Sequence, residues 1–183
     1  TSSLIQGESV TSNTFKLGDV MYDFSFTDTD GNEVKLSEVL AQKDMVMLNF
    51  WYVDCSACQT EFPVLQKAYE QYSDDVAIIA LNPMNSNQDV ANFQASYGLT
   101  FDMTACPASW ANVFGVQGYP TTIVVDRYGR ICLVESGALL TERYWTALFD
   151  HFTAADKAAV AVVVIVRKHH LFVGTGNGFV NTG

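Results

Sequence analysis

The stretch NFWYVDCSACQTEFP, residues 49 to 63, places two cysteines three positions apart directly after an apolar segment. Met45–Tyr52 is a continuous apolar run, which predicts a central strand with both faces covered. A helical pattern then runs from Cys55 to about Tyr72, with apolar residues along one side. Cys55 is therefore expected at the N-terminus of a helix that follows a buried strand.

This position gives the two cysteines different chemistry. At a helix N-terminus, the unpaired N–H groups and the macrodipole favour a thiolate over a thiol. Cys58 lies one turn further along the helix, close enough to Cys55 for a disulfide and more buried. The spacing predicts a reactive dithiol in which Cys55 attacks a substrate sulfur and Cys58 resolves the resulting mixed disulfide.

A metal site and an inert structural disulfide are the alternatives. Structural zinc usually takes a second closely spaced pair of Cys or His, whereas Cys106 and Cys132 are isolated and far apart in the sequence. Residue 59 is Gln, so the motif is not the C-x-x-C-H haem attachment site. The redox interpretation is favoured over both alternatives, and no metal or other cofactor is expected.

Composition and charge exclude several classes of protein. A chain of 183 residues can bury one substantial core, and 49% hydrophobic with 16% charged residues is typical of a globular protein. The formal net charge of −10 argues against nucleic acid or an anionic membrane surface as a partner. The longest apolar run, residues 158–166, is too short to cross a bilayer.

The pattern of apolar residues predicts alternating strands and helices around the motif. We expect further strands in two pieces of 22–36 and at 76–81, 101–103, 121–125 and 130–135, and helices from Ser37 and at 88–97, 108–114 and 142–152. The last two strands flank the turn sequence DRYG and form a hairpin. This order indicates an α/β sandwich with a mixed central sheet.

The two ends of the chain differ from its middle. Residues 1–17 are rich in Ser, Thr, Gly and Asn and are expected to form a flexible arm before a domain at 18–154. The tail, 155–183, is β-branched, then basic, then Gly-rich from Ala158 onward. Three interpretations stay open for it: a strand pair around Arg167–His170, an element swapped onto another chain, or a segment foreign to the natural protein.

The start of the chain and its cysteine count bear on location. The chain begins without Met and without a signal-peptide pattern, so we expect a mature or trimmed form from which any signal or anchor has been removed. Four cysteines permit two disulfides, which fits an exported protein. His151, His169 and His170 lie in the last helix or the tail and are expected at the surface rather than as ligands.

A second motif, GVQGYPTTIVVD, places Pro120 immediately before a strand, where a cis or an ordinary trans peptide is compatible with the sequence. With FWYVDCSACQTEFP, FTDTDGNEVKLSEVL and GYPTTIVVDRYG, the chain resembles the thioredoxin superfamily and, within it, the TlpA/ResA-like extracytoplasmic thiol–disulfide oxidoreductases of bacteria. The resemblance spans about Leu17 to Phe152. It implies a thioredoxin-like three-layer sandwich with an N-terminal β-hairpin extension.

The resemblance also implies roles for individual residues. It makes Cys55 the nucleophile, Cys58 the resolving cysteine, Pro120 a cis-proline facing them, Glu61 the acid that follows the motif, Pro63 the helix-kinking proline, and Trp51 and Tyr119, with Pro120, part of the substrate-binding surface. The implied partners are protein thiols or disulfides and an upstream redox partner. The implied location is extracytoplasmic, with a tether to a membrane through a removed N-terminal segment as one arrangement.

Three features of the sequence depart from the patterns of the thioredoxin superfamily. Asp54 stands before the first cysteine where Trp is common, and this carboxylate should oppose ionisation of Cys55. The intervening pair is Ser56-Ala57, without the usual proline. Asn49 stands where thioredoxin has a buried Asp, so proton transfer to and from Cys58 falls to Glu61 or to water. A solvated helix residue is the other interpretation of Glu61.

Cys106 and Cys132 have two open interpretations: two small buried hydrophobic residues, which is slightly favoured, or a second disulfide. Two other functions compete with the oxidoreductase. A thiol peroxidase of the peroxiredoxin type would carry Thr or Ser three residues before its reactive cysteine, and Tyr52 occupies that position. A non-catalytic thioredoxin-like interaction module would keep its cysteines permanently paired.

Overall fold

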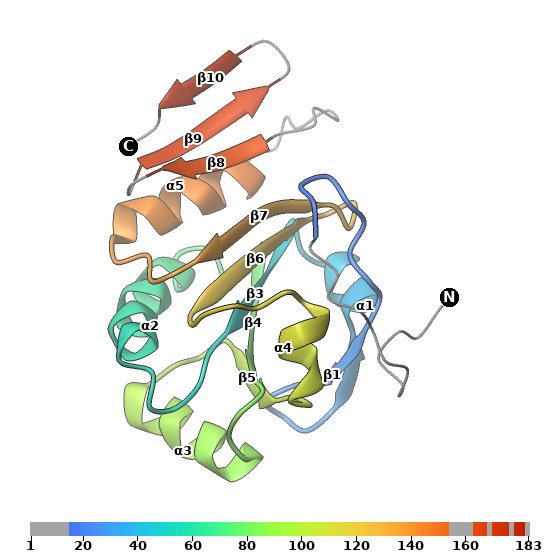
Figure 1. The fold of residues 1–183 in the computed structure, drawn as a ribbon, viewed down its shortest axis with the longest axis vertical. Helices are drawn as coiled ribbons and strands as arrows, with labels where there is room; N and C mark the ends of the chain where they lie inside the picture. The colour runs from blue at the N-terminus through green and yellow to red at the C-terminus, as the bar shows by residue number, and fades with distance from the viewer. Residues whose placement is uncertain (1–14, 154–162, 168–169, 176–177, 182–183) are drawn as a thin grey trace.

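A mixed five-stranded sheet runs through the centre of the molecule, with the strand order β5-β4-β3-β6-β7 (Figure 1). The structure is a computed structural model, and it describes residues 15–153, 163–167, 170–175 and 178–181. The strands of this sheet are β3 (Met45–Phe50), β4 (Val76–Asn82), β5 (Asp102–Ala105), β6 (Thr121–Asp126) and β7 (Ile131–Ser136). β3, β4 and β5 are parallel, whereas β6 and β7 are antiparallel to their neighbours.

The apolar runs of the sequence explain which strands are central. Every residue of β3, β4 and β6 is buried, because helices or the N-terminal segment cover both faces of the sheet. The edge strand β7 is buried only over its first three residues. The expected mixed sheet and thioredoxin-like sandwich are confirmed.

Helices lie on both faces of the sheet, and α2, α3 and α5 pack on one of them. The helices are α1 (Leu36–Leu40), α2 (Ser56–Tyr69), α3 (Asn87–Tyr97), α4 (Ser109–Val113) and α5 (Glu142–Thr153). α2 and α5 contact each other and, with α3, bury one apolar cluster that includes Trp51, Phe62 and Trp145. In Figure 1, α2 and α5 lie on the same side of the sheet.

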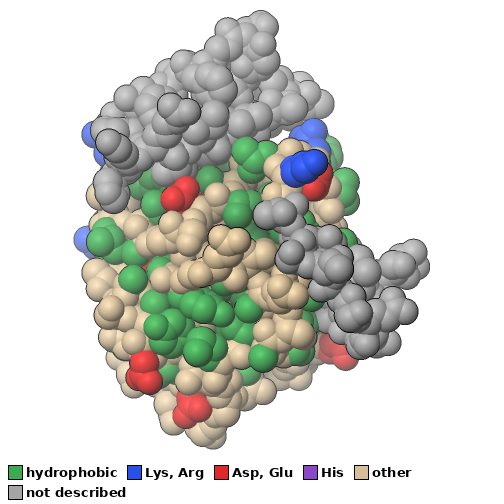
Figure 2. Space-filling view, in the orientation of Figure 1, with side chains coloured by type: hydrophobic (Ala, Val, Ile, Leu, Met, Phe, Trp, Pro, Cys, Tyr) green, Lys and Arg blue, Asp and Glu red, His purple; other side chains and the backbone are tan. Residues whose placement is uncertain are grey.

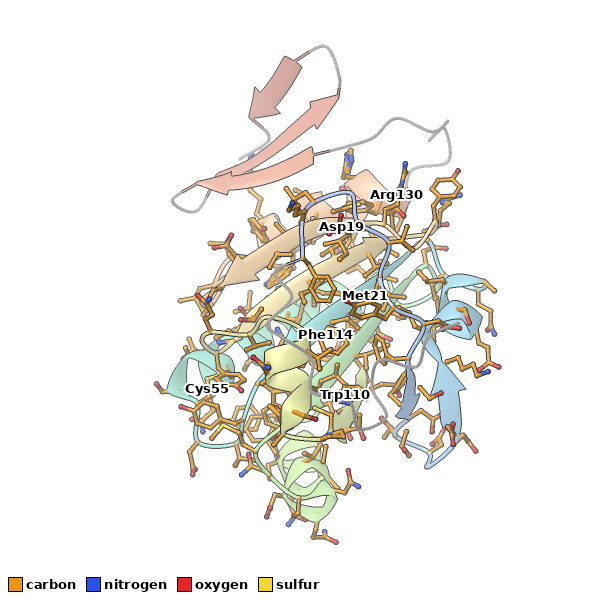
Figure 3. The ribbon with its side chains drawn as sticks, turned by 45° about the vertical axis from the view of Figure 1, so that its right-hand side comes forward. Asp19, Met21, Cys55, Trp110, Phe114 and Arg130 are labelled. Atoms are coloured by element: carbon orange, nitrogen blue, oxygen red, sulfur yellow. A yellow bond between two sulfur atoms is a disulfide. The ribbon has the colours of Figure 1, made fainter. Side chains whose placement is uncertain are left out.

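The opposite face is covered by α4 and by the N-terminal segment. Trp110 and Phe114 lie beside Met21 on this face, away from Cys55 (Figure 3). The N-terminal segment forms the expected hairpin, β1 (Ser25–Thr27) paired with β2 (Glu33–Lys35) in a sheet of its own. Gly31 closes the turn with φ of 87°, a conformation that other residues rarely adopt.

Part of the tail forms a third sheet. β8 (Val163–Arg167) pairs with β9 (His170–Thr175), with Arg167 opposite His170, and β10 (Gly178–Asn181) extends the sheet. Of the three interpretations of the tail, the strand pair is the one present here. The expected arm at 1–17, the boundary at 154–155 and His169 lie largely or wholly outside the described residues. In the described ranges, no helix is both long enough and apolar enough to cross a membrane.

Candidate active site

Cys55 and Cys58 form a disulfide at the start of α2 (Figure 3). Cys55 is the N-cap residue, and the backbone N–H of Cys58 donates a hydrogen bond of 3.1 Å to its Sγ. This bond would stabilise a thiolate on Cys55 after reduction, because it supplies one of the unpaired N–H groups of the helix terminus. Cys55 retains 4% exposure and Cys58 none, so Cys55 is the sulfur nearer to solvent.

The loop before Cys55 is held by two side-chain amides. The backbone N–H of Val53 donates to Asn85 Oδ1 at 2.9 Å, and Gln59 Nε2 donates to the carbonyl of Val53 at 2.7 Å. Asn85 Oδ1 also accepts from Asn82 Nδ2 at 3.1 Å. The backbone N–H and the carbonyl of Val53 are thus both hydrogen-bonded to side chains of other segments. These two bonds fix the loop that places Cys55 at the helix terminus.

Glu61 lies one helical turn beyond Cys58 and is fully buried. Asn49 Nδ2 donates to its Oε1 at 2.9 Å, and the backbone N–H of Leu139 donates to its Oε2 at 2.7 Å. Burial raises the pKa of the Glu61 carboxyl to about 7, although the bonds from Leu139 and Asn49 act in the opposite direction. The interpretation of Glu61 as a solvated helix residue is therefore wrong, and its carboxyl can exchange a proton near neutral pH.

Two tyrosines pack against the apolar cluster that contains the disulfide. The rings of Tyr52 and Tyr119 meet edge to face with 5.3 Å between their centroids, and both pack against the cluster that contains the two cysteines. The peptide bond between Tyr119 and Pro120 is cis, and Pro120 is buried immediately before β6. Tyr119 and Tyr52 are half-buried, so part of each ring is available to a partner.

Trp51 does not lie on this surface. It has no exposed area, and its ring packs against Phe62 and Phe93 with centroids 5.2 Å and 4.7 Å away. Trp51 directly follows β3 and its side chain is buried in the core, so it is not part of the exposed surface beside the cysteines. It belongs to the same buried apolar cluster as the two cysteines.

Known proteins are similar in sequence to this chain over the segment that contains Cys55, Cys58 and Glu61. The model of the AhpC/TSA family matches residues 17–134. The chain belongs to the AhpC/TSA family. It is also 30% identical to the thiol-disulfide oxidoreductase ResA of Halalkalibacterium halodurans over 126 residues, which make up 68% of this chain and 70% of that protein.

Solved structures of other proteins also superpose on the chain. A protein described as a thiol:disulfide interchange protein DsbE from Chlorobium tepidum gives a TM-score of 0.61 at 28% identity, over 68% of this chain and 88% of that one. The thioredoxin domain of a thiol-disulfide oxidoreductase from Bacteroides vulgatus gives 0.63 at 21% identity, over 76% of this chain and 100% of that one, and so shares the fold. The protein is a thiol-disulfide oxidoreductase with a thioredoxin-like fold.

The second pair of cysteines of this oxidoreductase is not joined. Cys106 follows β5 and Cys132 lies in β7, at opposite edges of the five-stranded sheet, and both are free thiols. Four strand spacings separate the two edges, roughly 19 Å. The alternative of a Cys106–Cys132 disulfide is therefore wrong. Burial raises the pKa of each thiol to about 12. Cys132 is buried, as the other interpretation has it, whereas Cys106 is half-buried.

Sequence reasoning missed three groups of the site. The backbone N–H of Leu139 has no signal in the sequence, because any residue except proline supplies it. In the sequence, Gln59 shows only that the C-x-x-C-H haem motif is not present, and nothing indicates its bond to Val53. Asn85 stands beside Ser86, and either is a common helix cap; Ser86 is the N-cap of α3 and bonds to Asp89, whereas Asn85 accepts from the N–H of Val53. Within the described residues, no three His, Cys, Asp or Glu side chains are grouped as a metal site.

Proposed function

We propose that this oxidoreductase exchanges disulfides with partner proteins, with Cys55 as nucleophile, Cys58 as resolving cysteine and Glu61 as the acid–base group for Cys58. The observation that supports this most directly is the disulfide at the N-terminus of α2, one turn from a buried carboxyl whose pKa lies at about 7. A carboxyl with that pKa can accept or return a proton at neutral pH.

In the reducing direction, the Cys55 thiolate attacks one sulfur of the partner's disulfide and displaces the other sulfur as a thiolate. Cys58 gives its proton to the Glu61 carboxylate, and its sulfur attacks Cys55 Sγ. The Cys55–Cys58 disulfide forms, the mixed disulfide breaks, and the partner's second thiolate leaves. Two electrons pass from the enzyme dithiol to the partner, and an upstream thiol protein restores the dithiol.

The partner would dock on the surface beside Cys55. Tyr52, Val53 and Tyr119 are half-buried there and pack against the cysteine cluster. In Figure 2, apolar side chains gather between α2 and α4, where charged side chains are sparse. We propose that an extended partner segment adds as a strand along the backbone at residue 119, so that main-chain hydrogen bonds supply affinity and selectivity is broad.

The proposed location is outside the cytoplasm. A redox-active disulfide needs partners that supply and accept electrons, and exported compartments hold proteins that form disulfides. The resemblance to the TlpA/ResA-like group supports the same location. The domain that performs this function is proposed to be 18–154.

Trapping a mixed disulfide tests the proposal. Cys58→Ser should accumulate partner proteins bound to Cys55, whereas Cys55→Ser should accumulate none, and each change should abolish turnover of a disulfide substrate. In the reduced wild-type protein, limited iodoacetamide should modify Cys55 before Cys58, as read by mass spectrometry. Preferential labelling of Cys58 would reverse the roles, and rapid consumption of peroxide without disulfide exchange would establish the peroxidase alternative instead.

A further inference from the structure

Two bonds close the segment that carries the active-site cysteines. The inner one is the disulfide between Cys55 and Cys58. The outer one is a hydrogen bond of 2.7 Å, in which Nε2 of Gln59 donates to the carbonyl of Val53. Both cysteines lie between Val53 and Gln59 in the chain, so the hydrogen bond closes a larger loop around the disulfide. Reduction breaks the inner bond and leaves both groups of the outer bond chemically unchanged.

The outer bond relates the two cysteines to each other and not only to the rest of the domain. Gln59 directly follows Cys58 in α2, and its backbone N–H donates to the carbonyl of Cys55 at 3.0 Å. Its side chain then reaches back to Val53, in the loop before Cys55. Asn85, which accepts from the N–H of Val53, ties the same loop to the segment after β4 instead. Gln59 therefore fixes the loop before Cys55 against the helix that carries Cys58.

The environment of the outer bond limits competition from water. Gln59 and Val53 are both half-buried, and Val53 packs against the apolar cluster that contains the two cysteines. A hydrogen bond is stronger where the local dielectric constant is low. The side-chain amide is uncharged and does not titrate, so the bond is available at every pH at which the thiols react.

Two closures of one segment reinforce each other. Formation of either bond removes conformational freedom that the other bond would otherwise have to remove. Linkage is reciprocal, so the hydrogen bond is stronger when the disulfide is closed, and the disulfide closes more readily when the hydrogen bond is present. After reduction, the hydrogen bond keeps the two sulfurs close together and raises the effective concentration of Cys58 at Cys55.

We propose that Gln59 is a positioning residue that favours closure of the Cys55–Cys58 disulfide by holding the carbonyl of Val53. This inference rests on the proposed function, in which Cys58 resolves the mixed disulfide on Cys55. In that step the Cys58 thiolate attacks Cys55 Sγ, the Cys55–Cys58 bond forms, the bond from Cys55 to the partner breaks, and the partner sulfur leaves as a thiolate. Gln59 acts through the backbone of Val53 and takes no part in these bond changes. It lowers the reduction potential and shortens the lifetime of the mixed disulfide.

Two substitutions in α2 separate this role from general stabilisation of the helix. Gln59→Met removes the amide and keeps the length of the side chain, and Met forms helices about as well as Gln. Gln66→Met is the matched control, because Gln66 also holds a loop to α2. Its Nε2 donates to Thr100 Oγ1 at 2.8 Å, and its Oε1 accepts from the N–H of Thr100 at 3.0 Å. Gln66 lies toward the other end of the helix from the cysteines.

Equilibration with a redox buffer of dithiothreitol gives the reduction potential of each protein. A net hydrogen bond changes an equilibrium constant by up to about tenfold. Gln59→Met should therefore lower the equilibrium constant for disulfide formation by about threefold to tenfold, which raises the potential by about 14–30 mV. Gln66→Met should keep the potential of the wild type, although it removes two hydrogen bonds and lowers the stability of the fold.

Stopped-flow mixing of the reduced protein with an aromatic disulfide that releases a coloured thiolate separates the two chemical steps. The first release reports attack by Cys55, and the second release reports resolution by Cys58. Gln59→Met should slow the second release by about threefold to tenfold, because Cys58 loses effective concentration at Cys55. The first release needs no closure of the loop and should keep its rate within about twofold of the wild type.

Urea unfolding of the oxidised and the reduced proteins closes a thermodynamic cycle. The unfolded chains of the wild type and of Gln59→Met form the disulfide equally well. The variant should therefore destabilise the oxidised protein more than the reduced one, by an amount that matches its shift in potential. Equal destabilisation of both forms, with an unchanged potential, would make Gln59 a merely structural residue and overturn the proposal. The same shift in potential for Gln66→Met would overturn it as well.

The proposed function is tested apart from this inference. If the wild type reduces the aromatic disulfide and Gln59→Met keeps the wild-type potential, the role of Gln59 is overturned and the proposed function stands. If the wild type reduces no disulfide substrate, the proposed function fails, and the positioning role of Gln59 in resolution fails with it.

Discussion

The two faces of the central sheet share the same strands but bury different kinds of side chain. Both faces bury aromatic rings, and under α4 the ring of Phe114 alone contacts four others: Phe15, Phe24, Phe50 and Trp110. The face under α2 and α5 buries Asn49, Glu61 and Thr122 among its apolar side chains. Burial of polar groups costs free energy. We therefore expect the face under α2 and α5, which carries the redox site, to contribute less to the free energy of folding than the face under α4.

Phe114 offers the largest effect on stability. Phe114→Ala should lower the free energy of unfolding by about 3–5 kcal/mol, because it removes a buried ring and leaves a cavity among four others. Urea unfolding followed by circular dichroism measures the loss. Val20→Ala, at a side chain that is 71% exposed, is the control and should stay within about 0.5 kcal/mol of wild type. A loss of specific redox activity in the folded fraction of Phe114→Ala would show that the two faces are not separate in function.

Glu61 gives the next largest effect, and its sign depends on pH. The pKa of its carboxyl is raised from 4.5 to about 7 in the folded, oxidised protein. Between these values the folded state binds more protons than the unfolded state, so the stability of the wild type falls as pH rises through this window. Relative to Glu61→Gln, the wild type should lose about 3 kcal/mol between pH 4.5 and 7, and nothing more above pH 8.

Unfolding curves of both oxidised proteins at a series of pH values give this difference. Glu142→Gln is a suitable control, since Glu142 forms an ion pair with Lys67 at the surface and lies outside the buried polar group of Asn49, Glu61 and Thr122. A difference that is constant across the whole range would mean that Glu61 titrates as an ordinary exposed carboxyl.

A substitution of Asn85 tests how far the active site depends on the loop before Cys55, which Asn85 holds through the N–H of Val53. Asn85→Ala should cost about 1–2 kcal/mol, because the backbone N–H of Val53 and the side-chain amide of Asn82 both lose their acceptor. It should also speed alkylation of Cys55 in the reduced protein, since the loop before Cys55 is freed. Gln88→Ala, which removes only an exposed bond to Asn92, should leave both measurements unchanged. Equal effects of the two changes would contradict the loop assignment.

Asp54 gives the smallest effect. Its side chain is exposed directly before Cys55, so Asp54→Asn should lower the pKa of the Cys55 thiol only slightly and raise the rate of alkylation by no more than about twofold. Added salt should shrink the difference, because screening weakens an exposed charge. A rate that falls, or an effect that does not respond to salt, would show that Asp54 acts through local structure instead of charge.

The parts of the molecule that follow from local pattern were predictable from the sequence. The apolar runs of β3 and β4 and the position of Cys55 before a helix fixed the strand–cysteine–helix unit, and the structure has it as expected. The parts that depend on which segments meet were not predictable. Glu61 reads equally well as exposed or buried until α5 and the loop at Leu139 are placed over it.

Trp51 and Cys132 show the same limit. The side chain of a residue that directly follows a buried strand can point to the surface or into the core. The alternation of side chains along the strand does not decide between the two directions, because it stops where the strand ends. Two cysteines in one domain suggest a pair only until the strand order is known. The order β5-β4-β3-β6-β7 places their segments at opposite edges, and no local feature of the sequence gives that order.

The backbone of Leu139 connects the buried carboxyl to a natural fluorophore. The N–H of Leu139 donates to Glu61, and the carbonyl of Leu139 accepts a 3.1 Å bond from the indole Nε1 of Trp145. Ionisation of the carboxyl places a negative charge close to Trp145 and changes the electric field at the indole, whose emission responds to such a field. The enzyme thus carries an internal optical indicator of the protonation of its active site, which can be followed in real time without a label.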